Sequence, residues 1–127
     1  MTIDQTNDLR TAGAQAMRAA LPGVFPDGDL DLRDGKVGEE LVEIGLTSVW
    51  GALWAREGLG PRERSLVTLG ILIALRAETE LRTHVRIALT NGVTRDEIAE
   101  VIYHSAGYAG YPAAVGARTA ARQAFGE

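Results

Sequence analysis

Residues 66–75 form the longest apolar run of the chain, and only Thr68 and Gly70 interrupt it. A membrane-spanning helix needs about 20 apolar residues, so this run is too short to cross a bilayer, and we expect a core segment. Its valine, isoleucine and threonine content also suits a strand. However, Gly60-Pro61 places proline at a first helical position, and no hairpin signal is present. We therefore predict a helix that is almost wholly buried.

Five other segments show apolar residues at helical spacing, separated by turn residues. Asn91-Gly92 ends one of them, because glycine readily takes the left-handed cap conformation. Thr94 and Glu97 match a capping box that opens the next. The chain's 127 residues suffice for one domain with a core and are too few for two ordinary domains. We predict an all-α, single-domain bundle of about six helices over residues 1–127, the other five at residues 9–20, 37–58, 78–90, 94–108 and 113–125.

The charge and cysteine content exclude several classes of function. The formal net charge is −4, which argues against nucleic acid and anionic membranes as main partners. The chain has no cysteine, so disulfides, thiolate metal sites and thiol catalysis are impossible. Residues 1–10 are polar and acidic, unlike a secretory signal. We expect a cytoplasmic protein.

The two histidines, His84 and His104, are the only side chains with an ordinary pKa near neutrality. His84 follows Glu80 by one helical turn, so Glu80 can either raise the pKa of His84 or fix its tautomer by accepting a ring N–H. At about 100° per residue, both histidines lie beside the apolar stripes of their helices. We expect both imidazoles to border the core rather than open solvent. A purely structural role is an equal alternative for each histidine.

Other chemistries have weaker support. Histidine and glutamate are common metal ligands, but the sequence has no clear set of three ligands at a characteristic spacing, such as a His-Glu-x-x-His run. We therefore expect no metal. A nucleophilic Ser65 or Ser105 would lack the Gly-x-Ser-x-Gly elbow. Neither a Gly-x-Gly-x-x-Gly motif nor a phosphate-binding loop is present, so we expect no nucleotide cofactor.

Several motifs, taken in order along nearly the whole chain, resemble the carboxymuconolactone decarboxylase family, which is part of the alkylhydroperoxidase D-like superfamily. They are Trp50-Gly51 with Trp54, Arg64-Ser65-Leu66-Val67-Thr68, Glu80-Leu81-Arg82-x-His84, Asn91-Gly92-Val93-Thr94, Glu97-Ile98-x-Glu100-Val101 and Tyr108-Ala109-Gly110-Tyr111-Pro112-Ala113-Ala114.

This resemblance implies an alkylhydroperoxidase D-like, all-α subunit that assembles into a homo-oligomer, typically a hexamer. It also implies a cofactor-independent decarboxylation of 4-carboxymuconolactone, a small-molecule lactone carboxylate, to the β-ketoadipate enol-lactone during protocatechuate degradation. Such a reaction needs a proton donor, cations that hold carboxylates, and donors that stabilise an oxyanion.

The resemblance assigns these tasks to particular residues. We expect His84 to be the acid, Glu80 to orient it, and His104 to be a second donor or oxyanion stabiliser. Either of two arginines can anchor a carboxylate, although each is more often a solvated surface charge. Four aromatic residues can wall a flat ring pocket, and a core or subunit-interface role is at least as good an explanation for them. The arginines are Arg64 and Arg82, and the aromatic residues are Trp50, Trp54, Tyr108 and Tyr111.

Some positions depart from the patterns of related proteins. The thiol peroxidases of the superfamily need a Cys-x-x-Cys pair, where this chain has Ala77 and Glu80. Residues 44–48 lack the expected basic and aromatic residues, and Ala109 replaces a frequent cysteine. Two alternatives therefore remain open: an enzyme recruited to another lactone or β-keto acid in biosynthesis, and a non-catalytic, oligomeric ligand-binding protein.

Overall fold

The computed structural model describes residues 2–127, which form six α-helices and one π-helical segment and contain no strand. The predicted all-α class is confirmed. The contacts divide the chain into two compact units, one up to Leu59 (unit 1) and one from Gly60 to Glu127 (unit 2). The single domain over residues 1–127 stays a prediction. Among the described residues, no helix combines the length and apolar character needed to cross a membrane.

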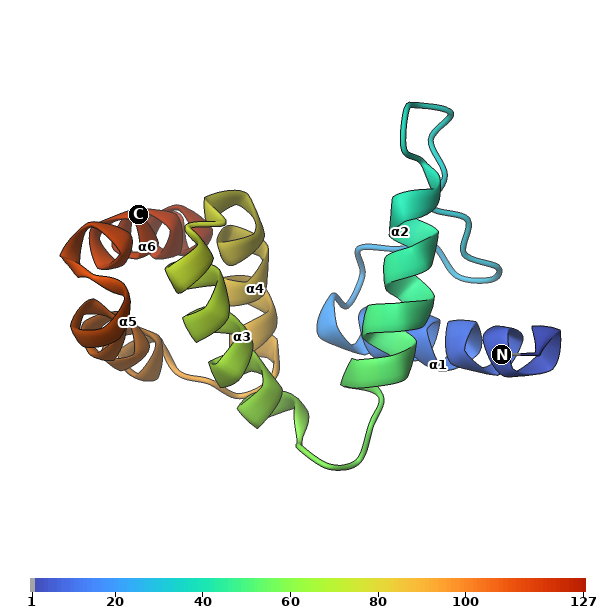
Figure 1. The fold of residues 1–127 in the computed structure, drawn as a ribbon, viewed down its shortest axis with the longest axis horizontal. Coiled ribbons are helices and arrows are strands. Elements are labelled where there is room, and N and C mark those ends of the chain that lie inside the picture. Colours follow the sequence, from blue (N-terminus) through green and yellow to red (C-terminus); the bar gives the residue numbers. More distant parts are fainter. Residues whose placement is uncertain (1) are drawn as a thin grey trace. The chain divides into compact units, whose positions relative to one another are not determined.

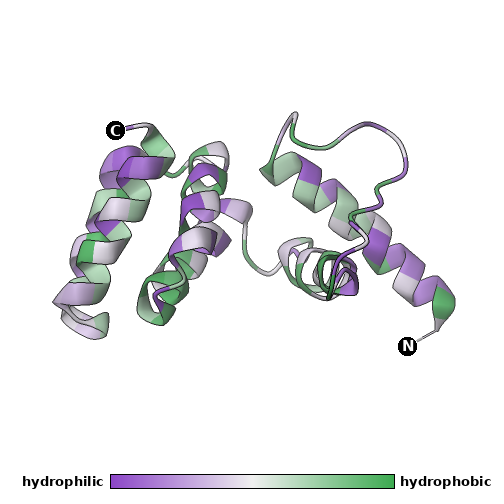
Figure 2. Cartoon of the chain, turned by 90° about the horizontal axis from the view of Figure 1, so that it is seen from above, coloured by the Kyte–Doolittle hydropathy of each residue, from purple (hydrophilic) through white to green (hydrophobic). Residues whose placement is uncertain are grey.

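Unit 1 contains α1 (Ile3–Ala20), α2 (Glu40–Gly45) and the π-helix η1 (Leu46–Trp54), which continues directly from α2 (Figure 1). A capping box at Thr2 and Gln5 starts α1. Polar and apolar residues alternate along the ribbon of α1 (Figure 2), and the helix buries one face, which includes Ala14 and Met17. The helix predicted over residues 9–20 is confirmed, and it begins earlier.

Two glycines allow α1 and η1 to pack with their backbones in close approach. A Cβ atom at Gly13 would lie 2.0 Å from the carbonyl oxygen of Leu46, and one at Gly51 would lie 2.0 Å from that of Leu9.

The prediction of one regular helix over residues 37–58 is wrong in part. Leu46 and Gly51 are five residues apart and are both buried against α1, an arrangement that the wider turn of a π-helix permits.

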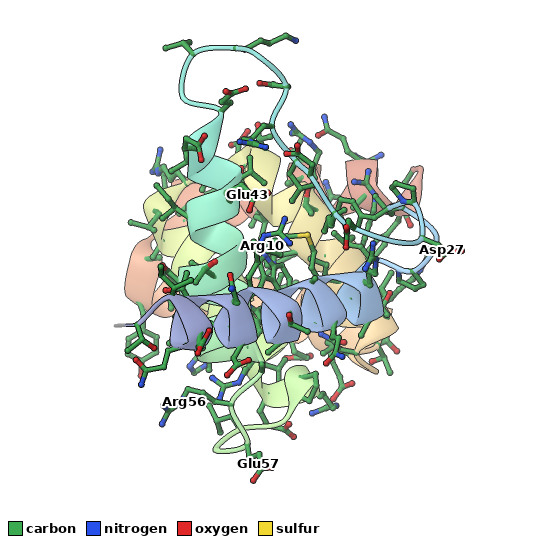
Figure 3. The ribbon with its side chains drawn as sticks, turned by 90° about the vertical axis from the view of Figure 1, so that its right-hand side faces the viewer. Arg10, Asp27, Glu43, Arg56 and Glu57 are labelled. Atoms are coloured by element: carbon green, nitrogen blue, oxygen red, sulfur yellow. The ribbon has the colours of Figure 1, made fainter. Side chains whose placement is uncertain are left out.

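An ion pair fastens the two helical parts of unit 1. Arg10 Nε donates to Glu43 Oε2 at 2.9 Å, and Arg10 Nη2 donates to Glu43 Oε1 at 3.0 Å. Both side chains are visible in Figure 3. Arg10 also donates to the carbonyl oxygen of Leu30 in the connecting loop. The hydrogen bond from Arg10 lowers the pKa of Glu43, so both groups stay charged near neutral pH.

Unit 2 contains α3 (Pro61–Leu75), α4 (Glu78–Thr90), α5 (Arg95–Ala109) and α6 (Tyr111–Phe125) (Figure 1). Helices α4 and α5 each pack against both α3 and α6. Small side chains on α6 allow this close packing. The buried core residues are Leu69, Ile73, Leu81, Val85, Ala88, Val93, Ile98, Ile102, Ala113, Ala114, Ala117, Ala120 and Ala121.

The local signals in the sequence place the ends of these helices well. Helix α3 begins at Pro61, and the capping box of Thr94 and Glu97 opens α5, as predicted. Gly92 has a φ of 92° after α4. Helix α6 begins at Tyr111, two residues before the predicted start, because proline is tolerated in the first turn of a helix.

The prediction that α3 is almost wholly buried is wrong. Ser65, Leu69 and Ile73 are buried, but three apolar residues on the other side of the helix are exposed. Their exposed fractions are 54% for Val67, 53% for Ile71 and 70% for Leu75. Apolar residues lie on both sides of α3, but the neighbouring helices of unit 2 bury only one of these sides.

Candidate functional site

Helix α4 carries the predicted acid–base pair. Leu81, Val85 and Ala88 turn toward the core and fix the rotation of α4. That rotation leaves Glu80 exposed and His84 half-buried. The expectation that His84 borders the core is therefore confirmed.

Two opposing effects set the charge of His84. Burial lowers the pKa of the imidazole, and the Glu80 carboxylate raises it by a smaller amount. The pKa of His84 therefore lies below its ordinary value. Raising the pKa of His84 is one of the two effects considered for Glu80 from the sequence, and this effect does not outweigh burial. Near neutral pH, His84 is mostly neutral, so it can both donate and accept a hydrogen bond.

His104 lies in a different environment, on α5. Its side chain is exposed, so the expectation that it borders the core is wrong. The His104 and Tyr108 rings lie 5.1 Å apart, centroid to centroid, and are tilted by 36°. His104 also lines a surface hollow of about 510 Å³ between α3 and α5. The other residues that line this hollow are Leu66, Gly70, Glu97, Glu100, Val101 and Ser105.

The lining of the hollow includes neither His84 nor Glu80. The two histidines come from α4 and α5, each of which packs on α3 and α6. Unit 2 therefore supplies two candidate positions for proton chemistry: a half-buried imidazole beside a carboxylate, and an exposed imidazole beside a tyrosine ring.

The two candidate arginines are placed differently. Arg64 is half-buried in the first turn of α3. Arg82, on α4, donates to Gln123 Oε1 and to Thr79 Oγ1, both at 3.1 Å. Arg82 therefore links α4 to α6. A guanidinium has five N–H donors, so these two hydrogen bonds leave donors that can bind a carboxylate.

The candidate aromatic residues fall into two groups. Trp50 and Trp54 lie in η1, where their rings stack with centroids 5.0 Å apart and planes inclined by 25°. Tyr108 and Tyr111 lie at the junction of α5 and α6, with exposed fractions of 85% and 75%. The tyrosines are therefore not core residues of unit 2.

The two serines considered as nucleophiles make structural hydrogen bonds. Ser65 is buried, and its Oγ accepts a hydrogen bond from Asn91 Nδ2 at 3.0 Å. Ser105 Oγ donates to the carbonyl oxygen of Val101 at 2.7 Å. Over residues 2–127, no group of three or more histidine, aspartate or glutamate side chains is arranged to hold a metal ion.

Sequence reasoning did not select Glu100 as a site residue, although Glu100 lies beside His104 in the hollow on α5. The signal was available. Residues 97, 100, 101 and 104 follow the i, i+3, i+4, i+7 spacing of one helix flank. The contribution of α3 through Leu66 and Gly70 carries no such signal, because it depends on how two helices pack.

These features define a small helical protein with a candidate proton donor on α4. The model of the carboxymuconolactone decarboxylase family matches residues 40–123, a span that includes both histidines and Glu80. The chain belongs to this family.

Three curated proteins illustrate the similarity. The chain is 49% identical over 76 residues to 4-carboxymuconolactone decarboxylase of Acinetobacter baylyi, which covers 60% of this chain and 57% of that protein. It is 47% identical over 66 residues to nitrosuccinic acid decarboxylase of Metarhizium robertsii, covering 52% and 46%. It is 36% identical over 85 residues to an uncharacterized 15.0 kDa protein of Paracoccus denitrificans, covering 65% and 63%. The matches thus span about half the length of the two named decarboxylases.

Proposed function

We propose that this protein is a carboxy-lyase that decarboxylates 4-carboxymuconolactone to the β-ketoadipate enol-lactone without a cofactor. The observation that carries the proposal is the 49% identity to 4-carboxymuconolactone decarboxylase over 76 residues. The His84–Glu80 pair on α4 supports it, because the reaction requires a proton donor from the protein.

The chemistry requires electron flow rather than a nucleophile. The bond between the ring carbon and the leaving carboxylate breaks, and its electron pair moves through the ring double bond into the lactone carbonyl. Carbon dioxide leaves, and an oxyfuran-like dienolate remains. One proton is then added at carbon. The protein has to hold the substrate's carboxylates, stabilise the developing oxyanion and supply this proton.

His84 is the proposed acid. In the free protein it is mostly neutral near pH 7, because burial lowers its pKa. A bound substrate brings carboxylates close to the imidazole, and nearby negative charge favours the protonated form. Substrate binding thus charges the acid that the reaction consumes. Glu80 acts in the same direction.

The remaining candidate residues have supporting roles in this proposal. His104 is a second donor or an oxyanion stabiliser, and Arg64 or Arg82 anchors a carboxylate. Tyr108 and Tyr111 of unit 2 wall the ring pocket.

The proposal also includes the assembly and location of the protein. We infer a cytoplasmic homo-oligomer, with the hexamer as the expected form. The exposed apolar side chains of Val67, Ile71 and Leu75 on α3 support self-association. Light scattering coupled to size-exclusion chromatography measures the mass, and a monomer at micromolar concentration would contradict this part of the proposal.

The activity is tested with the purified protein and 4-carboxymuconolactone. Loss of ring absorbance and release of carbon dioxide should proceed together, with one carbon dioxide per substrate. The His84→Gln variant should lose about 10²- to 10⁴-fold in kcat, the usual contribution of a general acid, while it keeps its helical circular dichroism. Turnover no faster than in buffer alone would refute the proposal.

A second candidate substrate is nitrosuccinic acid, because the chain is 47% identical over 66 residues to nitrosuccinic acid decarboxylase. The electronic demand is similar: a nitro group beside the breaking bond accepts the electron pair as a nitronate, which is then protonated at carbon. Comparing kcat/KM for the two acids in one preparation decides between them, and the preferred substrate should exceed the other by at least tenfold.

A further inference from the structure

Helices α5 and α6 enclose a groove of about 320 Å³ that the proposed reaction does not use. This volume is within the range of small-molecule pockets, which is about 300–1,000 Å³. The floor of the groove is apolar and includes Ile98, Ile102 and Phe125. Its lining includes neither histidine and lies wholly within unit 2.

The rim of the groove is positively charged. Arg95, Arg118 and Arg122 line it, together with the carboxylates of Asp96 and Glu127. These five groups carry a formal charge of +1, whereas the whole chain carries −4. The Arg95 guanidinium also lies over the Phe125 ring, 4.4 Å from its centroid. This contact holds a cation directly beside the apolar floor.

One carboxylate of the chain itself already sits between two of the arginines. Glu127 Oε1 lies 3.8 Å from Arg95 Nη1, and Glu127 Oε2 lies 3.8 Å from Arg122 Nε. These distances exceed hydrogen-bond length, and all three side chains are more than half exposed. The Glu127 carboxylate is therefore held weakly. A carboxylate that hydrogen-bonds the same guanidiniums would make stronger contacts.

We propose that the groove between α5 and α6 is a binding site for a small organic carboxylate with a flat apolar body. The apolar part of the ligand covers Phe125 and Ile102, and its carboxylate pairs with Arg95 and Arg122 in place of Glu127. The Glu127 side chain thus competes with the ligand from within the same chain. Arginine suits this task because its planar fork both pairs with a carboxylate and stacks on rings.

Benzoate is a suitable probe, because it combines a flat ring with one carboxylate. Titration of the full-length, ¹⁵N-labelled protein with benzoate should shift the amide signals of α5 and α6 around the groove in a saturable manner. Acetate lacks the ring and benzyl alcohol lacks the charge, so each should bind at least tenfold more weakly. Equal binding of benzyl alcohol, or shifts confined to other helices, would overturn the proposal.

Two substitutions test the electrostatic part of the proposal in opposite directions. Arg122→Gln should weaken benzoate binding at least fivefold, whereas Arg86→Gln, an exposed arginine on α4 outside the groove, should leave it unchanged. Glu127→Gln should tighten binding about threefold, because it removes the competing charge. Unchanged or weaker binding by Glu127→Gln would refute competition between Glu127 and the ligand, and with it the proposed carboxylate position.

Discussion

Glu80 and His84 lie one turn apart on α4. Burial lowers the pKa of the imidazole, and the Glu80 carboxylate raises it by a smaller amount. The balance leaves His84 below its ordinary pKa. Such a residue is seldom protonated in the empty protein, and its protonated fraction rises when an anion binds beside it. Since the proposed substrate is an anion, this balance links proton uptake to substrate binding.

The first prediction concerns the pH dependence of turnover. If the protonated form of His84 delivers the proton, kcat/KM is highest at acidic pH and falls as the pH rises through the pKa of the free protein. Because burial lowers this pKa, the fall should be centred below about 6.5, the ordinary pKa of histidine. A pH–rate profile of kcat/KM on 4-carboxymuconolactone measures it.

The Glu80→Gln variant tests whether His84 is the group whose titration produces that profile. The substitution keeps the size of the side chain and removes the charge that raises the pKa of His84, so the fall should move to lower pH. A profile whose midpoint stays in place would show that His84 is not the titrating group.

The second prediction concerns stability. His84 has a lower pKa in the folded protein than in the unfolded chain, so folding favours its neutral form. The resulting stability is fully present above the unfolded pKa of about 6.5, and it is lost as the pH falls through the folded pKa. Urea unfolding at several pH values should therefore show that the difference between wild type and His84→Gln shrinks toward acidic pH. A constant difference would contradict burial of a neutral imidazole.

The third prediction separates the roles of the two histidines. His104 is exposed, so His104→Gln should change the free energy of unfolding by no more than about 0.5 kcal/mol, as is usual for surface positions. If His104 touches the reacting substrate, kcat falls about 10²-fold in this fully stable variant. Arg86→Gln is the matched surface control. Unchanged kcat in His104→Gln would remove His104 from the proposed site.

Much of the fold follows from local signals that the sequence carries. Pro61, the Thr94–Glu97 capping box and Gly92 each act within a few residues of their position, so they predict the ends of the helices in unit 2. The half-buried position of His84 follows from the same source, because Leu81 and Val85 fix the rotation of α4.

Other features depend on packing between segments that are distant in the sequence. The exposed side of α3 could not be predicted, because Val67 and Ile71 are as apolar as the buried Leu69 and Ile73. The π-helix could not be predicted, because the apolar spacing of the sequence does not distinguish a π-helical turn from an α-helical one. The wider turn depends on how Gly51 packs against α1. The exposure of His104 likewise depends on how much of the α5 surface is covered by α3.

The last prediction tests this glycine contact in unit 1. Gly13→Ala and Gly51→Ala would each place a methyl group 2.0 Å from a backbone carbonyl oxygen, so α1 and η1 must move apart. Overpacking of this kind typically costs about 1–3 kcal/mol. Gly45→Ala is the control, since it lies in a helical conformation with no atom within 4 Å of an added Cβ. It should be neutral or slightly stabilising, because alanine favours helix over glycine by about 1 kcal/mol. Thermal unfolding of the three variants gives the comparison. Equal stability of Gly51→Ala and Gly45→Ala would show that α1 and η1 do not pack through these glycines.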